Sequence, residues 1–463
     1  MRTRHLLPLA GALVLAGCLG PRPASPVGSA VVPPPAWRTT LAPGMPIAAQ
    51  WWQAFGDPQL TALVTRALTE SPDLGSAAAR VDEARAQERL ARAQLSPNVT
   101  AGASASEARS VTAFGTGLDQ LGGQPLVQAS YDADLFGRLR AARAAARAQL
   151  LATEAARDTV RLALASGVAS GYVTLRALDH RLHIAEETLA ARTDALRIAR
   201  RRAETGYTSN LELRQAQGEY RSTEQLVAAA RLAVTRQENA LSVLVGGNPG
   251  PIPRGLPIDR LVRPPIPDGL PADLLRRRPD LYQAEQALVA ADRSLDSARA
   301  AMLPSLGLTG SAGVVLSNAL KNPLTVFSIG GSVLAPIFDA GRLRAQADAG
   351  AARRDQAAFA YRKAALTAFR EVDDSLASVR RSGEQAAALA GQRTAQADAL
   401  RIASNRYRAG YSSYLEQLDA QRGLLNAELA LAEAQANQLT AYITLYQAMG
   451  GGWSDAAIRA TAR

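Results

Sequence analysis

The chain has 463 residues, of which 47% are hydrophobic and 20% are charged, and its formal net charge is +11. This length and apolar content allow a large folded core and exclude an intrinsically disordered chain. Nearly all the positive charge is arginine, since Lys321 and Lys363 are the only lysines. Together with the abundant alanine, this indicates compositional bias rather than a nucleic-acid-binding surface.

Residues 1–17 have the pattern of a lipoprotein signal peptide. Two arginines precede an apolar stretch that is too short to span a membrane as a stable helix. The sequence Leu-Ala-Gly-Cys at 15–18 then matches a lipobox, and Cys18 is the only cysteine. We therefore predict lipid attachment at Cys18, whose acyl chains would anchor the protein. The alternative is an ordinary signal peptide that happens to contain a cysteine. Leu19, rather than aspartate, is the pattern of lipoproteins sorted to the outer membrane.

The mature chain begins with a predicted tether and a helical segment. Residues 18–56 are rich in proline and predict an extended, lipid-anchored tether. Residues 57–96 predict the first helices, because Asp57 can cap a helix whose first position is Pro58. No apolar run after Cys18 approaches the ~20 residues that a transmembrane helix needs. If the mature chain crosses a membrane, its strands must form a closed barrel.

Residues 97–137 predict a β-hairpin. Small apolar and polar residues alternate over Asn98–Ser106 and again over Gln124–Phe136, and the glycine-rich stretch Val111–Gly123 predicts a loop between them. One apolar and one polar face per strand is the pattern of a transmembrane barrel. A half-buried hairpin of a soluble protein would give the same alternation.

Residues 138–247 predict a long helical hairpin. Leu139–Glu204 contains no proline, and about 65 residues in a helix would extend ~100 Å. Leucines recur every seven residues, which is the period of a coiled coil, at Leu175, Leu182, Leu189 and Leu196. Gly206 predicts a turn, and the returning helix begins near Asn210.

The order of elements then repeats. Residues 248–279 predict a proline-rich linker, after which Gly410 follows Gly206 at an offset of 204 residues, as Gln421 follows Gln217. This indicates an internal duplication. The second repeat is predicted to comprise a helix at 280–303, a β-hairpin at 304–340, a helical hairpin at 341–449 and a tail at 450–463.

The arrangement predicts a membrane protein of mixed α and β class. Single-chain bacterial barrels start at about eight strands, so the four predicted strands cannot close alone, and unpaired backbone in lipid costs several kcal/mol per group. The barrel must therefore be shared between chains. The long helices carry too many charges to lie in lipid, so we expect them to project into the periplasm.

Several motifs resemble the TolC/NodT family of outer-membrane factors, especially its lipoprotein branch for drug efflux. They are Trp51-Trp52 before Asp57-Pro58, the tip motif at 409–421 and Gly-Gly-Gly-Trp at 450–453. The resemblance implies a homotrimer with a twelve-stranded outer-membrane β-barrel, continued by a periplasmic α-helical tunnel. It also implies docking to a periplasmic adaptor protein and to an inner-membrane transporter, usually of the resistance-nodulation-division class.

The resemblance places a periplasmic gate at the second turn, where acidic residues ring the aperture. By position these are Glu416 and Asp419. We expect Leu415 and Leu418 to pack inward, so that Glu416 and Asp419, three residues apart, share another face. Three copies would form a negative constriction that attracts cations. A solvated helix start, where acids suit the helix dipole, is the alternative.

The resemblance also implies a contact across the tip. Glu212 occupies the matching place in the first turn, and the family pairs such an acid with a tyrosine before the second glycine, here Tyr407. Better-studied members carry an arginine two residues after that glycine, where this chain has Ser412. A second contact through that position is therefore not expected.

The two turns are the predicted contact surface for the adaptor, with a plain turn as the alternative. The residues concerned are Gly206, Tyr207, Thr208, Ser209, Gly410, Tyr411, Ser412 and Ser413.

The sequence predicts no enzyme, cofactor or metal site, and three functions remain open. The first is the passive exit duct of a tripartite efflux pump for drugs or other small molecules. The second is the outer-membrane duct of a type I protein secretion system. The third is a lipid-anchored periplasmic coiled coil without a pore, against which the alternating strands argue. The transported substrate is not encoded here, because selection lies with the inner-membrane partner.

Overall fold

The computed structural model describes residues 21–39, 47–111, 113–115 and 117–454, so Cys18 and the predicted signal peptide lie outside the described residues. Three chain segments form each of two compact units. The first unit comprises the chain up to Val31, Ala79–Glu154 and Gln283–Lys363. The second comprises Val32–Ala78, Ala155–Tyr282 and the chain from Ala364 onward.

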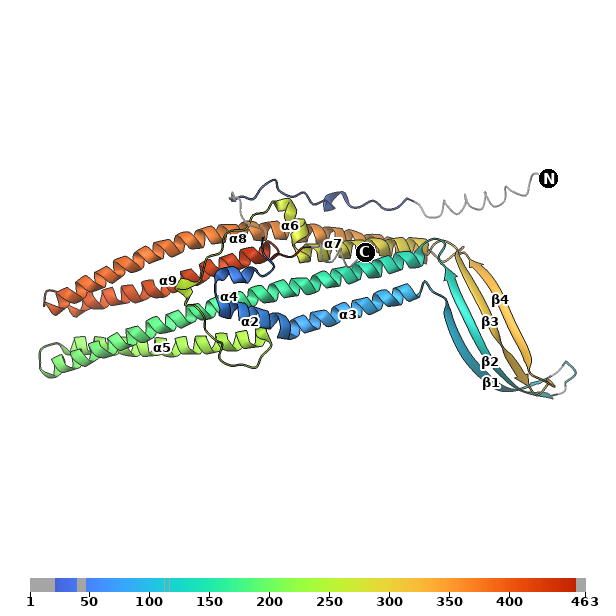
Figure 1. The fold of residues 1–463 in the computed structure, drawn as a ribbon, viewed down its shortest axis with the longest axis horizontal. Coiled ribbons are helices and arrows are strands. Elements are labelled where there is room, and N and C mark those ends of the chain that lie inside the picture. The colour runs from blue at the N-terminus through green and yellow to red at the C-terminus, as the bar shows by residue number, and fades with distance from the viewer. Residues whose placement is uncertain (1–20, 40–46, 112, 116, 455–463) are drawn as a thin grey trace. The chain divides into compact units, whose positions relative to one another are not determined.

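Helices and strands alternate in two similar series (Figure 1). In chain order they are η1 (Val27–Ser29), η2 (Trp51–Phe55), α2 (Pro58–Glu70), α3 (Pro72–Ala93), β1 (Asn98–Val111), β2 (Gly117–Ala133), α4 (Arg138–Glu204), α5 (Asn210–Val245), η3 (Ile258–Arg260), α6 (Pro271–Arg277), α7 (Pro279–Ala300), β3 (Ser305–Ser317), β4 (Leu324–Leu334), α8 (Arg342–Arg408) and α9 (Tyr414–Ala448). The expected combination of four strands with long helices is confirmed.

The strands of the first unit form one antiparallel sheet in the order β1-β2-β3-β4, as Figure 1 shows. Ala129 of β2 lies opposite both Val99 of β1 and Gly310 of β3, and Gly310 in turn lies opposite Ile329 of β4. Within the described residues, β1 and β4 each have a strand partner on one side only. The outer edges of both strands therefore carry free backbone groups.

The loop expected at Val111–Gly123 is much shorter than predicted, because strand residues occupy most of this range. β1 continues to Val111 and β2 already begins at Gly117. Gly122 and Gly123 pair with β1 on one side and with β3 on the other. Backbone hydrogen bonds to two neighbouring strands hold this stretch extended, although its glycines provide no side-chain alternation for a sequence pattern to detect.

The second unit has a core of aromatic and aliphatic side chains around a buried carboxylate. Trp51 packs against Trp52, Phe55 and Tyr446, with ring centroids 5.6–6.3 Å apart. The buried Asp57 caps α2 by accepting hydrogen bonds from the first backbone N–H groups of the helix. The hydroxyl of Tyr172 on α4 donates to the same carboxylate at 2.9 Å. The buried Asp57 carboxylate thus joins α2 to α4, and both of its oxygens accept hydrogen bonds.

The long helices α4 and α8 each contain 67 residues, which corresponds to ~100 Å of helix. The returning helix α5 buries Val227, Val234 and Leu241, which recur every seven residues. This is the coiled-coil packing that the sequence period predicts.

The proline-rich stretch 248–279 contains a short helix, α6. Pro271 occupies the first helical position, and the carboxylate of Asp273 accepts a hydrogen bond from the backbone of Leu270 at 3.3 Å. These are favourable N-terminal features of a helix. Among the described helices, none combines the length and apolarity required to cross a membrane.

The described part of the predicted tether contacts α7, α8 and the segment that precedes α6. In the first unit, Arg22 forms an ion pair with Asp292 of α7 at 2.7 Å, and Arg354 of α8 donates to the carbonyl of Pro23 at 2.6 Å. In the second unit, the indole of Trp37 is buried and donates to the carbonyl of Gly269 at 2.8 Å. Side-chain contacts therefore fix an extended segment that has few backbone hydrogen bonds of its own.

Candidate functional site

The candidate site is the tip of the second unit, where α4 turns into α5 and α8 turns into α9. Both turns end a helix in the same way. Gly206 and Gly410 adopt the left-handed conformation, with φ of 71° and 77°. The next N–H, of Tyr207 or Tyr411, donates to the carbonyl five residues earlier at 2.8 and 2.9 Å. This is the hydrogen bond of a Schellman cap, and it explains why glycine stands at both positions.

A small apolar cluster joins the four helices at the tip. Its buried members are Ala199, Ala216, Tyr414 and Leu418, one or two from each of α4, α5 and α9, and Tyr407 of α8 packs against them. The clustering of residues from both repeats holds the two helical hairpins together at this end of the unit.

The expected inward packing of Leu415 is wrong. Leu418 is 2% exposed, whereas Leu415 is 57% exposed. The buried partner of Leu418 is Tyr414, four residues earlier. Residues four apart share a helix face, while Leu415 is rotated by about 100° from Tyr414 and therefore faces away from the cluster.

Tyr407 and Glu212 are brought together across the two repeats. The Tyr407 hydroxyl donates a hydrogen bond to one carboxylate oxygen of Glu212. The hydroxyl of Thr208 donates to the other oxygen at 2.6 Å. The carboxylate thus joins the first turn to the end of α8.

Arg202 is a member of this group that the sequence analysis missed. Its guanidinium donates to the Tyr407 hydroxyl at 3.0 Å. It also lies 5.7 and 5.4 Å from the ring centres of Tyr207 and Tyr407, within the range of a cation–π contact. One arginine therefore contacts an aromatic side chain from each repeat. Its place in the last turn before Gly206 is the signal that could have identified it. We refer to Arg202, Thr208, Glu212 and Tyr407 as the tip latch.

The environment of Tyr407 keeps its hydroxyl protonated. Burial, followed by the hydrogen bond to the Glu212 carboxylate, raises the pKa of Tyr407 from 10 to about 12. A neutral phenol next to a carboxylate is a donor over the whole neutral range of pH.

A second polar cluster, also missed from the sequence, connects the two hairpins. Arg192 of α4 is 3% exposed and lies 3.3 Å from the carboxylate of Glu219 on α5. Arg422 of α9 donates to the same carboxylate at 2.9 Å, and Arg192 also donates to the side chain of Gln421. Burial lowers the pKa of Arg192. We refer to these four residues as the inter-hairpin cluster. A single acid here offsets two arginines from different repeats.

Glu416 and Asp419 are exposed on α9 and lie away from the buried face formed by Tyr414 and Leu418. The Glu416 carboxylate is 4.0 Å from the guanidinium of Arg406, and both side chains are more than half exposed. Solvent screens an ion pair of this kind, so it leaves the charge of the face largely available.

The residues of the two turns differ in their contacts. Tyr207 and Tyr411 are each 80% exposed. The Ser209 hydroxyl accepts from the backbone of Glu212 and caps α5, whereas Ser413 makes no side-chain cap at α9. Within the described residues, the buried hydroxyl of Ser412 has no hydrogen-bond partner.

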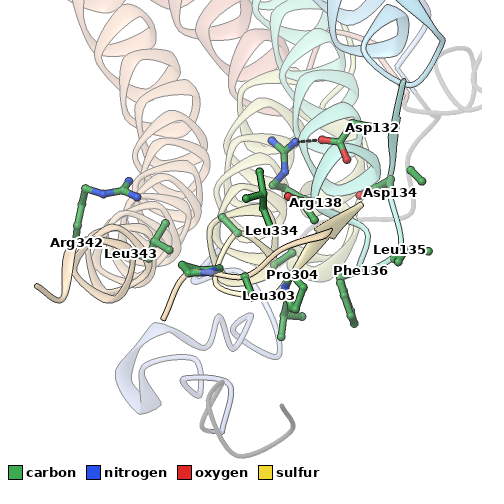
Figure 2. Close-up of a pocket in the computed structure, with 16 residues that line it drawn as sticks. Asp132, Asp134, Leu135, Phe136, Arg138, Leu303, Pro304, Leu334, Arg342 and Leu343 are labelled. Atoms are coloured by element: carbon green, nitrogen blue, oxygen red, sulfur yellow. Dashed lines mark hydrogen bonds and ion pairs between the residues drawn. The ribbon is translucent and has the colours of Figure 1, made fainter. Parts of the chain in front are cut away.

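A separate cavity lies in the first unit, where the strands meet the helices (Figure 2), with a volume of about 480 Å³. Figure 2 shows Arg138 directed toward Asp132, at 2.6 Å. Asp134 accepts backbone hydrogen bonds from Leu139 and Arg140 at the start of α4. Asp134 therefore caps the start of α4, while Asp132 pairs with the side chain of its first residue. Across the described residues, no group of three His, Cys, Asp or Glu side chains is arranged to hold a metal ion.

Comparison with known proteins identifies relatives over nearly the whole chain. The family model described as outer membrane efflux protein matches residues 63–247 and 270–451. The probable efflux pump outer membrane protein TtgC of Pseudomonas putida is 36% identical over 467 residues, covering 98% of this chain and 96% of its own. The pyoverdine export outer membrane protein OpmQ of Pseudomonas aeruginosa is 35% identical, with 97% of both chains covered.

A solved structure supports the same relationship. The open state of the MtrE outer membrane channel of Neisseria gonorrhoeae superposes with a TM-score of 0.81 at 29% identity. The match covers 93% of this chain and 97% of the MtrE chain. The similarity thus extends to the fold over 93% of the chain.

Proposed function

Because the chain belongs to the outer membrane efflux protein family, we propose that it forms the exit duct of a tripartite efflux pump in the outer membrane. It conducts drugs or other small molecules passively and catalyses no reaction. The observation that carries this proposal is the repeated architecture, in which a sheet with two free edges leads into long helical hairpins.

The duct is a homotrimer. One chain contributes four strands, and β1 and β4 each have a free outer edge among the described residues. Joining β4 of one copy to β1 of the next satisfies these edges, and three copies form a closed barrel of twelve strands. Free edges within lipid would otherwise leave backbone groups unpaired at several kcal/mol each.

Glu416 and Asp419 form the acidic ring of the periplasmic gate, and Glu212 and Tyr407 hold that gate closed. Support comes from the exposure of both acids on one side of α9 and from the hydrogen bond between Tyr407 and Glu212. The inter-hairpin cluster assists, because it ties α9 to α4 and α5. Opening separates the hairpins and breaks both sets of contacts.

The two turns are the docking surface for a periplasmic adaptor, which links the duct to an inner-membrane transporter of the resistance-nodulation-division class. Support comes from equivalent exposed side chains in the two repeats, which are Tyr207 with Tyr411 and Leu211 with Leu415. Apolar side chains presented in matched pairs suit a partner that binds both hairpins in the same way. Cys18 carries the lipid that anchors the duct to the outer membrane.

Reconstitution of the purified protein in a planar lipid bilayer tests the proposal. We expect discrete conductance steps that are small at rest, because the gate is closed. A protein that inserts but stays silent under all voltages and salt concentrations would contradict the duct.

A further inference from the structure

A strongly basic groove lies beside the tip, between the end of α4 and the start of α5 in the second unit. It has a volume of about 870 Å³. Its charged and aromatic lining, called here the basic groove, consists of Arg197, Arg200, Arg201, Glu204, Tyr220 and Arg221. Gly218 also lines it, and a side chain added there would meet nothing within 4 Å.

The positive charge of the groove is only partly offset within the chain. Arg197 pairs with Asp194 at 3.2 Å and Arg221 pairs with Glu224 at 2.7 Å, in exposed contacts along their own helices. For Arg200 and Arg201, the described residues supply no ion pair, and both side chains are exposed. Counting Asp194, Glu204 and Glu224, three carboxylates stand against four guanidinium groups. The positive field of the groove therefore comes mainly from Arg200 and Arg201.

The second repeat provides an internal comparison, because each position there follows its counterpart by 204 residues. Ser404 and Asn405 stand where the first repeat has Arg200 and Arg201. Leu425 replaces Arg221, and the long side chain of Arg422 replaces Gly218. The helix ends and the turn are the same in both repeats. Neither the helix nor the Schellman turn therefore requires these arginines.

We propose that the basic groove binds an acidic helical segment of the periplasmic adaptor, and that the first hairpin therefore recognises its partner differently from the second. This rests on the proposed function, which supplies the partner. Guanidinium groups form forked hydrogen bonds with carboxylates. The Arg221 guanidinium lies over the Tyr220 ring, 5.4 Å from its centre, at the edge of the groove. Two antiparallel helices that border an open floor at Gly218 accommodate a third helix.

The probe for binding is a synthetic alanine-based helical peptide with glutamate at every fourth position, measured by fluorescence anisotropy against the full-length protein. A peptide with glutamine in place of glutamate is the matched ligand control. The variant Arg200→Ser with Arg201→Asn introduces the residues of the second repeat. We expect it to weaken binding of the acidic peptide roughly tenfold, as two exposed ion pairs would.

The matched protein control is Arg393→Ser with Arg401→Ser, which removes the same charge from the second hairpin. If the peptide binds in the basic groove, this control should keep an affinity within about twofold of that of the unsubstituted protein. If binding depended on net charge alone, both variants would lose the same affinity. Binding by the unsubstituted protein should also weaken as salt rises. This last measurement needs no variant and tests the charge-driven contact directly.

Three results would overturn the inference. One is equal affinity for the glutamate and glutamine peptides. Another is dissociation of the assembly in the Arg200/Arg201 variant but not in its control, because a second copy of the chain would then occupy the groove. The third is tighter binding to phosphatidylglycerol vesicles than to the peptide. If the protein conducts in a bilayer but gives one of these results, only the binding role of the basic groove is refuted. If the protein does not conduct, the proposed function is refuted.

Discussion

At the scale of single residues, Tyr407 is the side chain whose chemistry is most clearly defined by its surroundings. Its hydroxyl donates to Glu212 and accepts from Arg202, so it mediates between an acid and a base of the first repeat. The Arg202 guanidinium also lies 5.4 Å from the centre of its ring, so the described contacts between α8 and the rest of the tip latch all involve Tyr407. The tyrosine is therefore the point at which the latch can be opened selectively.

Replacing Tyr407 with phenylalanine should open the gate without disturbing the ring packing against Tyr414. The change removes a hydrogen bond to a charged group, which contributes about 1.5–3 kcal/mol. We expect the open probability in a planar bilayer to rise by roughly tenfold or more. Tyr411→Phe is the matched control, since Tyr411 is 80% exposed and should show no effect. Equal behaviour of the two variants would argue against the latch.

Alkaline pH should release the same contact. The pKa of Tyr407 is raised from 10 to about 12 in the folded protein. Because the pKa is raised on folding, the protonated Tyr407 stabilises the closed tip fully below pH ~10, and this stabilisation is lost as the pH rises through ~12. Conductance should stay low from neutral pH to about 10 and increase above it. In Tyr407→Phe this increase should be absent, and an unchanged alkaline response would assign it to another group.

A separate prediction concerns the acidic face of α9. Substituting Glu416→Ala together with Asp419→Ala should raise the conductance and reduce the preference for cations, because the charge that attracts counter-ions to the constriction is removed. Single-channel recordings at low salt, where screening is weak, provide the measurement. Conductance and ion selectivity equal to those of the unsubstituted protein would remove both residues from the aperture.

At the scale of elements, the inter-hairpin cluster determines how α4, α5 and α9 hold together. Arg192 is almost fully buried, and Glu219 is the acid that offsets it. Removing one partner of a buried ion pair leaves an unpaired charge, which costs more than the pair itself contributes. The stability of the closed tip should therefore depend on Glu219 far more than on the exposed acids nearby.

The variant Glu219→Gln should destabilise the tip by about 3–5 kcal/mol, as expected for a buried charge that loses its partner. Hydrogen exchange of α4, α5 and α9 near the turns measures this local opening. Glu224→Gln is the control on the same helix, because Glu224 pairs with the exposed Arg221 and should change exchange by less than about 0.5 kcal/mol. Similar protection in both variants would mean that the cluster does not hold the hairpins.

At the scale of the whole molecule, the duplication explains why one chain is insufficient. Each repeat supplies a strand pair and a helical hairpin, and the four strands together form an open sheet. The unpaired backbone groups at the two sheet edges become hydrogen-bonded when the sheets of several copies join into a closed barrel.

We therefore expect the protein in mild detergent to have a mass close to three times the 48.7 kDa of the chain. Light scattering corrected for bound detergent gives this value directly. The assembly should persist on dilution, because its strands pair continuously between copies. A monomer that keeps its secondary structure would contradict the shared barrel.

Several features were accessible from the sequence alone. The 204-residue offset between Gly206 and Gly410 revealed the duplication, and the absence of proline over Leu139–Glu204 identified the long helix. The motif resemblance to an outer-membrane factor family is confirmed by the family match. These features depend on local chemistry, namely backbone freedom at glycine and the helical period, so a linear pattern contains them.

The tertiary structure alone decided which side chains meet. Leu415 is expected from the sequence to pack inward but is exposed, because the helices packed against α9 decide which of its faces is buried. Arg192 looked like one of many surface arginines, yet it is buried against Glu219 and Gln421 from two other helices. Arg202 likewise acquires its role from Tyr407, about two hundred residues away in sequence. Burial and charge compensation are properties of three-dimensional packing, and no pattern within a single helix specifies them.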